Sequence, residues 1–254
     1  MELSACIEMI FREEPFVDRI QMAAEAGADA IEFWDWRDKD LDAVTKRCAE
    51  TGVDFAAMLG SSIPLTDPDR TNEAAEDLHE SIEVAADYDC PNLIVTVGRE
   101  QDELERNTQH DAIVTVLDRV ATDAEGAGVT LGVEPLNTIV DHPGYYLTSS
   151  AEGYEIVETV DSPAVKLLFD IYHQQVSEGN VTRNLTSDIG QVGYVHIADV
   201  PGRHEPTTGE LNYANVLAAL DDAGYDGYVG CEFTPEHDPS AAIENCRNLL
   251  SLSN

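Results

Sequence analysis

The chain has 254 residues, 43% of them hydrophobic, which is enough for one large domain with a sizeable core. Its 50 acidic residues outnumber 14 basic ones, so the formal net charge is −36 at pH 7. Because so few cations are available to neutralise phosphates, this composition argues against nucleic acid as a partner. No stretch approaches the roughly 20 apolar residues of a membrane-spanning helix, so we also expect no membrane insertion.

The acidic residues are spread along the chain, with many on the polar faces of two predicted helices, 68–88 and 100–127. An acidic interaction protein would instead concentrate them in a tail or block. A surface this acidic repels itself at low salt and is screened at high salt, so the composition indicates a halophilic protein. The first residues carry neither a basic segment nor a long apolar run, so we expect no signal peptide and a cytoplasmic location.

The cysteine content predicts thiols rather than disulfides or a zinc site. The number of cysteines is odd, and their spacings match neither a zinc knuckle nor a CxxC redox pair. Reduced and mostly buried side chains are therefore expected at Cys6, Cys48, Cys90, Cys231 and Cys246.

Short β-rich runs alternate with helical patterns from one end of the chain to the other. The predicted strands cover residues 3–7, 30–34, 54–59, 93–97, 130–136, 165–171, 194–198 and 227–232. The helical windows cover residues 15–26, 39–51, 68–88, 100–127, 148–160, 181–190, 212–224 and 238–252. Gly27, Gly52 and Gly128 are placed to end the helices ahead of the second, third and fifth strands. Ser149 and Glu152 form a candidate capping box.

Eight strand–helix units without a domain-sized break predict a single (β/α)8 TIM barrel domain over residues 1–254. The alternative is an open, doubly wound sheet, which usually carries a glycine-rich phosphate turn after its first strand. Here the first strand is followed by residues 8–12, Glu-Met-Ile-Phe-Arg, which contain no glycine. The sequence therefore favours the closed barrel.

The last four predicted strands each carry an ionisable residue near the C-terminal end, where barrel enzymes place their active sites. These residues are Glu134, Asp170, His196 and Glu232. For each one alone, a salt-bridged barrel residue is an equally good reading, because a buried carboxylate needs a partner or a metal. Together, at the exits of consecutive strands, they predict one divalent metal ion. Three carboxylates and one imidazole suit Mn²⁺, Mg²⁺ or Co²⁺ better than a structural zinc.

Two further residues are candidates for contact with a substrate. His173 follows Asp170 by three positions and could reach a substrate oxygen, or support another side chain through a hydrogen bond. Arg203 lies in the loop after the seventh strand and could hold a substrate carboxylate through a bidentate contact. The alternative for Arg203 is a salt bridge within its loop, to Glu205 or Glu210.

Several segments resemble the hydroxypyruvate isomerase family, which belongs to the xylose-isomerase-like barrels alongside the ketose 3-epimerases. The resemblance covers the whole chain and is strongest from 128 to 235. The run Ala-Asp-Val-Pro-Gly-Arg-His-Glu-Pro is its most specific part. The segments are Glu-Pro-Leu-Asn at 134–137, Asp-Ile-Tyr-His-Gln-Gln at 170–175, the run 197–206, Thr-Gly-Glu-Leu-Asn-Tyr at 208–213 and Gly-Cys-Glu at 230–232.

This resemblance implies a function for each candidate residue. Glu134 and Glu232 would act as the acid–base pair, and Arg203 or His204 would neutralise a substrate carboxylate. His173 would also contact the substrate. The metal ligands that the resemblance implies are Glu134, Asp170, His196 and Glu232.

The implied activity is an aldose–ketose type isomerisation of a small substrate, hydroxypyruvate to tartronate semialdehyde, through a cis-enediolate. A ketose 3-epimerase or a 2-oxo-tetronate isomerase is the alternative within the same barrels. Two departures keep it open: the family often has Gln at the place of His196, and it usually reads Glu-Tyr-Lys-Pro where this chain has Glu-Phe-Thr-Pro at 232–235. Related barrels often form dimers or tetramers, so a homo-oligomer is one expected state.

Two other classes are less well supported by the sequence. A metal-dependent lyase or endonuclease on this scaffold is one of them, and the endonuclease would need more histidine ligands and a basic groove. A non-catalytic sugar-binding barrel would not need four convergent ligands.

Overall fold

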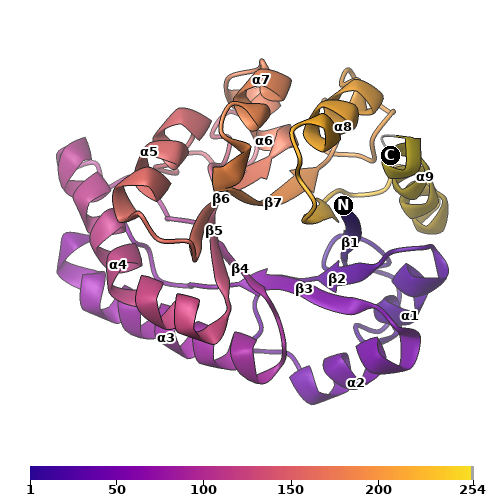
Figure 1. The fold of residues 1–254 in the computed structure, drawn as a ribbon, viewed down its shortest axis with the longest axis horizontal. Helices are drawn as coiled ribbons and strands as arrows, with labels where there is room; N and C mark the ends of the chain where they lie inside the picture. Colours follow the sequence, from indigo (N-terminus) through magenta and orange to yellow (C-terminus); the bar gives the residue numbers. More distant parts are fainter. Residues whose placement is uncertain (253–254) are drawn as a thin grey trace.

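The computed structural model describes residues 1–252, and it confirms the predicted (β/α)8 TIM barrel. Eight parallel strands close into a ring, with each strand beside the next and the eighth paired with the first. Figure 1 shows this ring at the centre of the molecule with the helices packed around it. The strands are β1 (Glu2–Cys6), β2 (Ala30–Glu32), β3 (Asp54–Leu59), β4 (Asn92–Val95), β5 (Thr130–Val133), β6 (Val165–Asp170), β7 (Val192–Ile197) and β8 (Tyr228–Cys231).

All eight predicted strands are present, and seven of them end one to three residues earlier than predicted. The strand pattern of 30–34 stops at Glu32, and that of 130–136 stops at Val133. Apolar residues continue beyond both ends, and Phe33 and Leu136 remain buried in the loops. The apolar pattern in the sequence therefore runs past the strand ends, because these loop residues are buried although they do not pair in the sheet. The consequence for the site is that Glu134 lies directly at the exit of its strand.

The eight predicted helical windows also have counterparts, at α1 (Asp18–Glu25), α2 (Leu41–Thr51), α3 (Thr71–Asp87), α4 (Arg106–Ala127), α5 (Ser150–Val160), α7 (Val181–Thr186), α8 (Tyr213–Asp222) and α9 (Pro239–Leu252). Gly52 and Gly128 end α2 and α4 in the left-handed conformation expected of a C-cap. Only one of the two contacts of the predicted capping box is present. The Oγ atom of Ser149 caps α5 by accepting a hydrogen bond from the backbone N–H of Ala151 at 3.2 Å. The carboxylate of Glu152 forms an ion pair with Arg106 instead.

One helix, α6 (Ile171–Ser177), was not predicted. It begins directly where β6 ends, with Asp170 as its N-cap. The Oδ1 atom of Asp170 accepts a hydrogen bond from the backbone N–H of His173 at 2.9 Å. The apolar run through Ile171 conceals the boundary, because strand and helix are both buried there. The side chain of Asp170 is thus fixed by the helix start.

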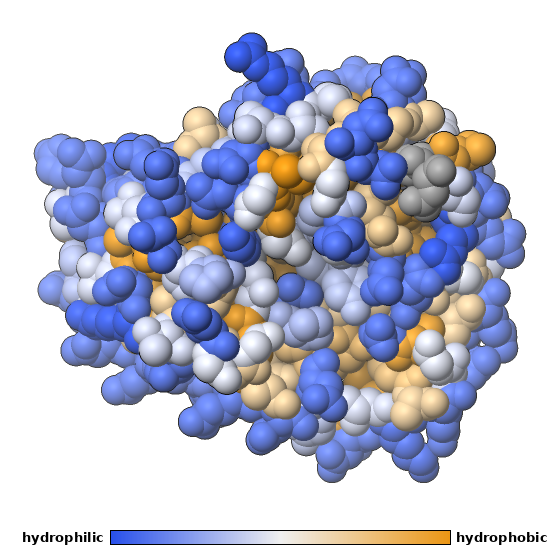
Figure 2. Space-filling model, in the orientation of Figure 1, coloured by the Kyte–Doolittle hydropathy of each residue, from blue (hydrophilic) through white to orange (hydrophobic). Residues whose placement is uncertain are grey.

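The core lies in two layers, one between the strands and the surrounding helices and a smaller one inside the barrel. Figure 2 shows hydrophilic residues dominating the outer rim of the face it draws, with hydrophobic patches nearer the middle. All five cysteines are free and buried, as predicted. Over residues 1–252, no helix is both long and apolar enough to cross a membrane.

Candidate active site

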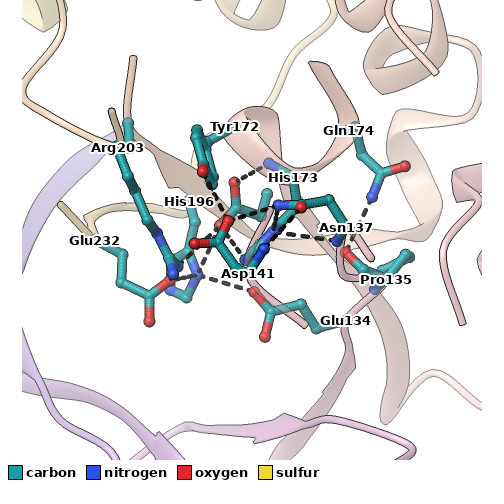
Figure 3. Close-up of polar contacts among 12 residues, drawn as sticks. Glu134, Pro135, Asn137, Asp141, Tyr172, His173, Gln174, His196, Arg203 and Glu232 are labelled. Carbon is teal, nitrogen blue, oxygen red and sulfur yellow. Dashed lines mark hydrogen bonds and ion pairs between the residues drawn. The ribbon is translucent and has the colours of Figure 1, made fainter. Parts of the chain in front are cut away.

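The structure brings the four predicted metal ligands together at the C-terminal mouth of the barrel. Glu134 and Glu232 directly follow β5 and β8, Asp170 ends β6, and His196 lies in β7. Their exposed fractions are 5%, 7%, 1% and 0%. The Nδ1 atom of His196 lies 3.3 Å from Glu134 Oε1, 3.5 Å from Glu232 Oε2 and 4.0 Å from Asp170 Oδ2. Figure 3 shows the side chains of Glu134, His196 and Glu232 pointing toward one another.

This cluster has the chemistry of a site for a divalent cation. Ligand atoms of Glu134, Asp170, His173 and Glu232 all lie within 4.8 Å of one another. The buried Oδ2 atom of Asp170 has no hydrogen-bond partner among the described residues, so it is available to a ligand. Three carboxylates held this close repel one another, and a cation between them relieves that repulsion. The donor set fits an oxygen-preferring metal ion.

The two histidines face the cluster in different protonation states. The Nδ1 atom of His173 lies 3.2 Å from the backbone N–H of Asn137 and 2.6 Å from its side-chain Nδ2. An atom that accepts from these donors carries no proton, so the proton of His173 is on Nε2. That Nε2 atom is buried and has no partner among the described residues. His173 therefore offers the site a hydrogen-bond donor and not the lone pair that a metal requires.

His196 has the arrangement that a metal ligand needs. Its Nε2 atom lies 3.0 Å from Oε1 of Glu32, while Nδ1 faces the three carboxylates. Although burial disfavours the charged ring, Glu32, Glu232 and Glu134 raise the pKa of His196 well above 6.5. In the metal-free protein its charged ring therefore balances part of the negative charge. A bound cation would take the place of the Nδ1 proton.

Arg203 is drawn into the cluster and does not pair within its own loop. Its Nη2 atom donates to Oε2 of Glu232 and lies 3.8 Å from Oδ2 of Asp170. The guanidinium carbon lies 5.3 Å from the ring centroid of Tyr172. The loop salt bridge to Glu205 or Glu210 is therefore not the arrangement that the structure shows. The Nε atom of Arg203 is buried without a partner among the described residues.

The two glutamates have widely separated pKa values in the metal-free protein. Burial raises the pKa of Glu134 to about 7, which the nearby His196 only partly offsets. Burial also acts on Glu232, but the charges of Arg203 and His196 outweigh it and lower its pKa to about 2. Burial lowers the pKa of His173 to about 4, so this ring is neutral at pH 7. The site thus holds one ionised and one partly protonated glutamate.

A cavity of about 310 Å³ lies against this cluster. Glu134, His173, Arg203 and Glu232 contribute polar groups to its wall. Apolar groups complete it, among them Leu59, Ile94 and Leu136. A small number of convergent polar groups in a mainly apolar cavity is typical of a binding site for a small molecule.

The family model that describes the xylose isomerase-like TIM barrel matches residues 20–252. The chain belongs to this family. Relatives of the xylose isomerase-like chain include a 2-oxo-tetronate isomerase of Cupriavidus necator, 32% identical, with 94% of this chain and 95% of that protein aligned. A hydroxypyruvate isomerase of Escherichia coli K12 is 27% identical, with 96% and 97% aligned. Both relatives are isomerases by name.

A solved structure supports the same fold assignment for this xylose isomerase-like barrel. The crystal structure of a Brucella melitensis protein described as AP endonuclease, family 2, superimposes with a TM-score of 0.89. The two chains are 29% identical, and the match covers 98% of this chain and 99% of the other. The family resemblance drawn from the sequence motifs is therefore confirmed at the level of family and fold.

His204 lies apart from the other predicted site residues. Its Nδ1 atom lies 2.8 Å from the backbone oxygen of Thr234. It is not among the residues that line the cavity in the described part of the chain. In the structure His204 therefore braces the loop after β8 against its own loop, and Arg203 is the neighbour that reaches the site.

Sequence reasoning missed Glu32, which lies behind the cluster, and the contact that Trp34 makes with Glu232. Glu32 is 1% exposed, and it gives the same signal as the four predicted ligands, an acid at a strand end between Ile31 and Phe33. Trp34 donates from Nε1 to Oε1 of Glu232 at 2.9 Å, a contact between residues 198 positions apart. No local pattern could reveal that contact.

Asn137 was quoted within a motif but given no function. It orients His173 and also donates from Nδ2 to Asp141 at 2.9 Å. The hydroxyl of Tyr172 donates to the same Asp141 oxygen at 2.7 Å. Figure 3 shows Asn137 and Asp141 close to His173, with Tyr172 directed toward Asp141. This network fixes the wall of the cavity that carries His173.

Proposed function

We propose that this protein is a divalent-metal-dependent isomerase that interconverts hydroxypyruvate and tartronate semialdehyde. The observation that carries the proposal is the convergence of three buried carboxylates and the Nδ1 atom of His196 beside the cavity. Relatives named hydroxypyruvate isomerase and 2-oxo-tetronate isomerase, matched over nearly the full chain, support the same reaction class.

Four residues would hold the cation, which is proposed to be Mn²⁺, Mg²⁺ or Co²⁺. When bound, such an ion polarises a substrate carbonyl and its neighbouring hydroxyl and lowers the cost of negative charge on their oxygens. The oxygen-rich ligand set supports this choice of ions. The proposed ligands are Glu134, Asp170, His196 and Glu232.

Glu134 and Glu232 are the proposed acid–base pair. Glu232 is ionised at neutral pH and is ready to accept the proton of the hydroxyl-bearing carbon. Glu134 is the proposed group that returns a proton to the adjacent carbon, after which Glu232 releases its proton to solvent and Glu134 regains one before the next turnover. A pair of carboxylates whose pKa values are pushed apart is the arrangement expected for these two tasks. Between the two transfers the substrate is a cis-enediolate.

His173 and Arg203 are the proposed substrate contacts. The neutral ring of His173 can donate from Nε2 to a substrate oxygen without itself becoming charged. Arg203 uses Nη2 for Glu232, and its unpartnered Nε remains to hold a substrate carboxylate. An arginine held in a fixed position recognises a carboxylate with little loss of side-chain entropy.

A 2-oxo-tetronate isomerase is the second candidate, and two observations favour it. A relative of that name is 32% identical. The cavity volume of about 310 Å³ leaves room beyond a three-carbon substrate, toward the apolar wall of Leu59 and Ile94. The chemistry would be the same, with a longer substrate. A ketose 3-epimerase has less support, because the solved epimerases share only the fold with this chain at about 20% identity.

The test is a side-by-side assay of hydroxypyruvate, 2-oxo-tetronate and free ketoses with the Mn²⁺-loaded protein. We expect the highest kcat/KM for hydroxypyruvate, and loss of activity after chelation that added Mn²⁺ restores. A preference for 2-oxo-tetronate would select the second candidate. Activity unchanged by chelation, or no turnover of any of the three classes, would contradict the proposal.

Nucleic acid is not a proposed substrate. The solved structure from Brucella melitensis is described as an endonuclease, but the net charge of −36 in this chain repels a phosphate backbone. A small uncharged or singly charged substrate meets less of that repulsion. We propose a small-molecule substrate and a cytoplasmic location, with a homo-oligomer as a testable assembly.

A further inference from the structure

Glu32 is a buried carboxylate that has no task in the proposed reaction. It ends β2, is 1% exposed and does not line the cavity. Its Oε1 atom lies 3.0 Å from Nε2 of His196, and its Oε2 atom accepts a hydrogen bond from the hydroxyl of Tyr194. By hydrogen-bond geometry neither Glu32 Oε1 nor His196 Nε2 has a partner among the described residues, so their contact is a buried ion pair. That ion pair is the contact that the structure gives these two atoms.

The barrel wall leaves space for this pair at Gly230. Residue 230 lies opposite His196 in the pairing of β7 with β8. A Cβ atom at that position would lie 2.5 Å from Oε2 of Glu32 and 2.7 Å from Cδ2 of His196. Any side chain there would push the carboxylate or the ring aside. The sequence therefore keeps a glycine where the carboxylate and the imidazole meet.

Stability alone does not account for a carboxylate at this place. Removing a charged group from water is costly, and a well-packed apolar residue of similar size is often at least as stable as a buried ion pair. A carboxylate that accepts from the far nitrogen of an imidazole, in contrast, fixes the tautomer and the orientation of the ring. It also makes the near nitrogen a better electron-pair donor.

We infer that Glu32 is a positioning residue of the metal centre. Its carboxylate accepts the Nε2–H of His196, which holds the ring in place and leaves Nδ1 free to bind the cation. This inference rests on the proposed function, because it requires His196 to be a ligand. Tyr194 in turn holds the second oxygen of Glu32.

The experiment measures Mn²⁺ affinity by calorimetry for the full-length protein and for Glu32→Gln, which keeps the shape and removes the charge. We expect about 10–100-fold weaker binding in Glu32→Gln. The Co²⁺-loaded variant should also show shifted visible absorption bands, because the ligand field of His196 changes. Unchanged affinity and an unchanged spectrum would overturn the inference.

A double-mutant cycle separates positioning from a simple effect of charge. If Glu32 acts through His196, then Glu32→Gln should weaken binding by less than about threefold when His196→Gln is already present. An equal loss in both backgrounds would mean that the charge acts on the cation directly, and it would overturn the inference. Tyr194→Phe removes the hydrogen bond to the second oxygen of Glu32 but keeps the carboxylate, so it should weaken Mn²⁺ binding less than Glu32→Gln does.

Two further measurements keep the outcome decisive. A thermal melt in EDTA reports whether Glu32→Gln is folded. If it is not, nitrogen-15 NMR of the unaltered protein loaded with diamagnetic Mg²⁺ should show the proton of His196 on Nε2, and a proton on Nδ1 would overturn the inference. Failure of the unaltered protein to bind Mn²⁺ would overturn the proposed function as well. If the unaltered protein binds Mn²⁺ and turns over substrate, and Glu32→Gln binds Mn²⁺ equally well, then this inference alone is overturned.

Discussion

The guanidinium of Arg203 and the carboxylate of Glu232, which lie 29 positions apart in the sequence, form an ion pair inside the proposed active site. This pair decides the charge of Glu232, because Arg203 is the largest of the influences that lower its pKa against the effect of burial. The same guanidinium also lies 3.8 Å from Asp170. The positive charge of Arg203 therefore keeps Glu232 ionised, which is the form that can act as a base.

Replacing Arg203 by Met should move the acidic limb of the pH profile. Arg203 lowers the pKa of Glu232 to about 2, so its removal raises that pKa. The ionised form needed as a base is then lost at a higher pH as the solution is acidified, and we expect the limb of kcat/KM to move upward by about one unit or more. Arg203→Lys, which keeps the charge, should mainly raise KM. A limb that stays in place in Arg203→Met would contradict the pairing.

Metal affinity should rise with pH through neutrality. Burial raises the pKa of Glu134 to about 7, so the metal-free protein retains this proton well above the usual range of a glutamate. A cation has to displace it together with the Nδ1 proton of His196, which makes the apparent affinity for Mn²⁺ increase up to about a hundredfold per pH unit below that pKa. Calorimetry in buffers of different ionisation enthalpy measures the released proton. Equal affinity at about pH 6 and pH 8 would contradict the raised pKa.

Glu232→Gln should lose turnover even at saturating Mn²⁺. The amide cannot accept a proton, and a positioned proton-transfer group contributes about 10²–10⁴-fold. Deuterium exchange between substrate and solvent should fall with turnover, since both need removal of the carbon-bound proton. Asp111→Asn, which changes an exposed acid on α4 outside the site, is the control. Normal turnover of Glu232→Gln at full metal occupancy would exclude this residue as the base.

The stability of the protein should increase with salt. Fifty acidic residues repel one another when the Debye length is long, and about 2 M KCl shortens it to a few Å. We expect the Tm to rise steadily from low salt to about 2 M KCl, beyond what an equal osmolality of sucrose produces. A Tm that does not depend on KCl would mean that the acidic surface is not a halophilic adaptation.

Much of the fold followed from local patterns, because alternating apolar runs and glycine caps such as Gly52 and Gly128 are properties of neighbouring residues. The ionisable residues at the ends of the last four strands could be predicted in the same way. The contacts that complete the site could not. Arg203 turns toward Glu232 from a loop in which its own backbone is left-handed (φ 55°), and the sequence contains no rule for that direction.

The helix α6 and the residue Glu32 were missed for different reasons. The start of α6 was hidden because Ile171 continues the buried pattern of β6 into the helix without a break. Glu32 carried the same signal as Glu134, but β2 lies far from the motifs on which the family resemblance rests. Its contact with His196 joins residues that are 164 positions apart in the sequence (196 − 32). Such pairings depend on barrel closure and become visible only in three dimensions.

The two oxygens of Asp170 face different ways, one capping α6 and the other directed into the cluster without a partner. The side chain of Asp170 therefore serves both the start of α6 and the proposed metal site. Asparagine would keep the cap but give up the charge, and glutamate would keep the charge but reach past the helix start. Position 170 is consequently constrained twice, and a change there would disturb both the shape and the reactivity of the mouth.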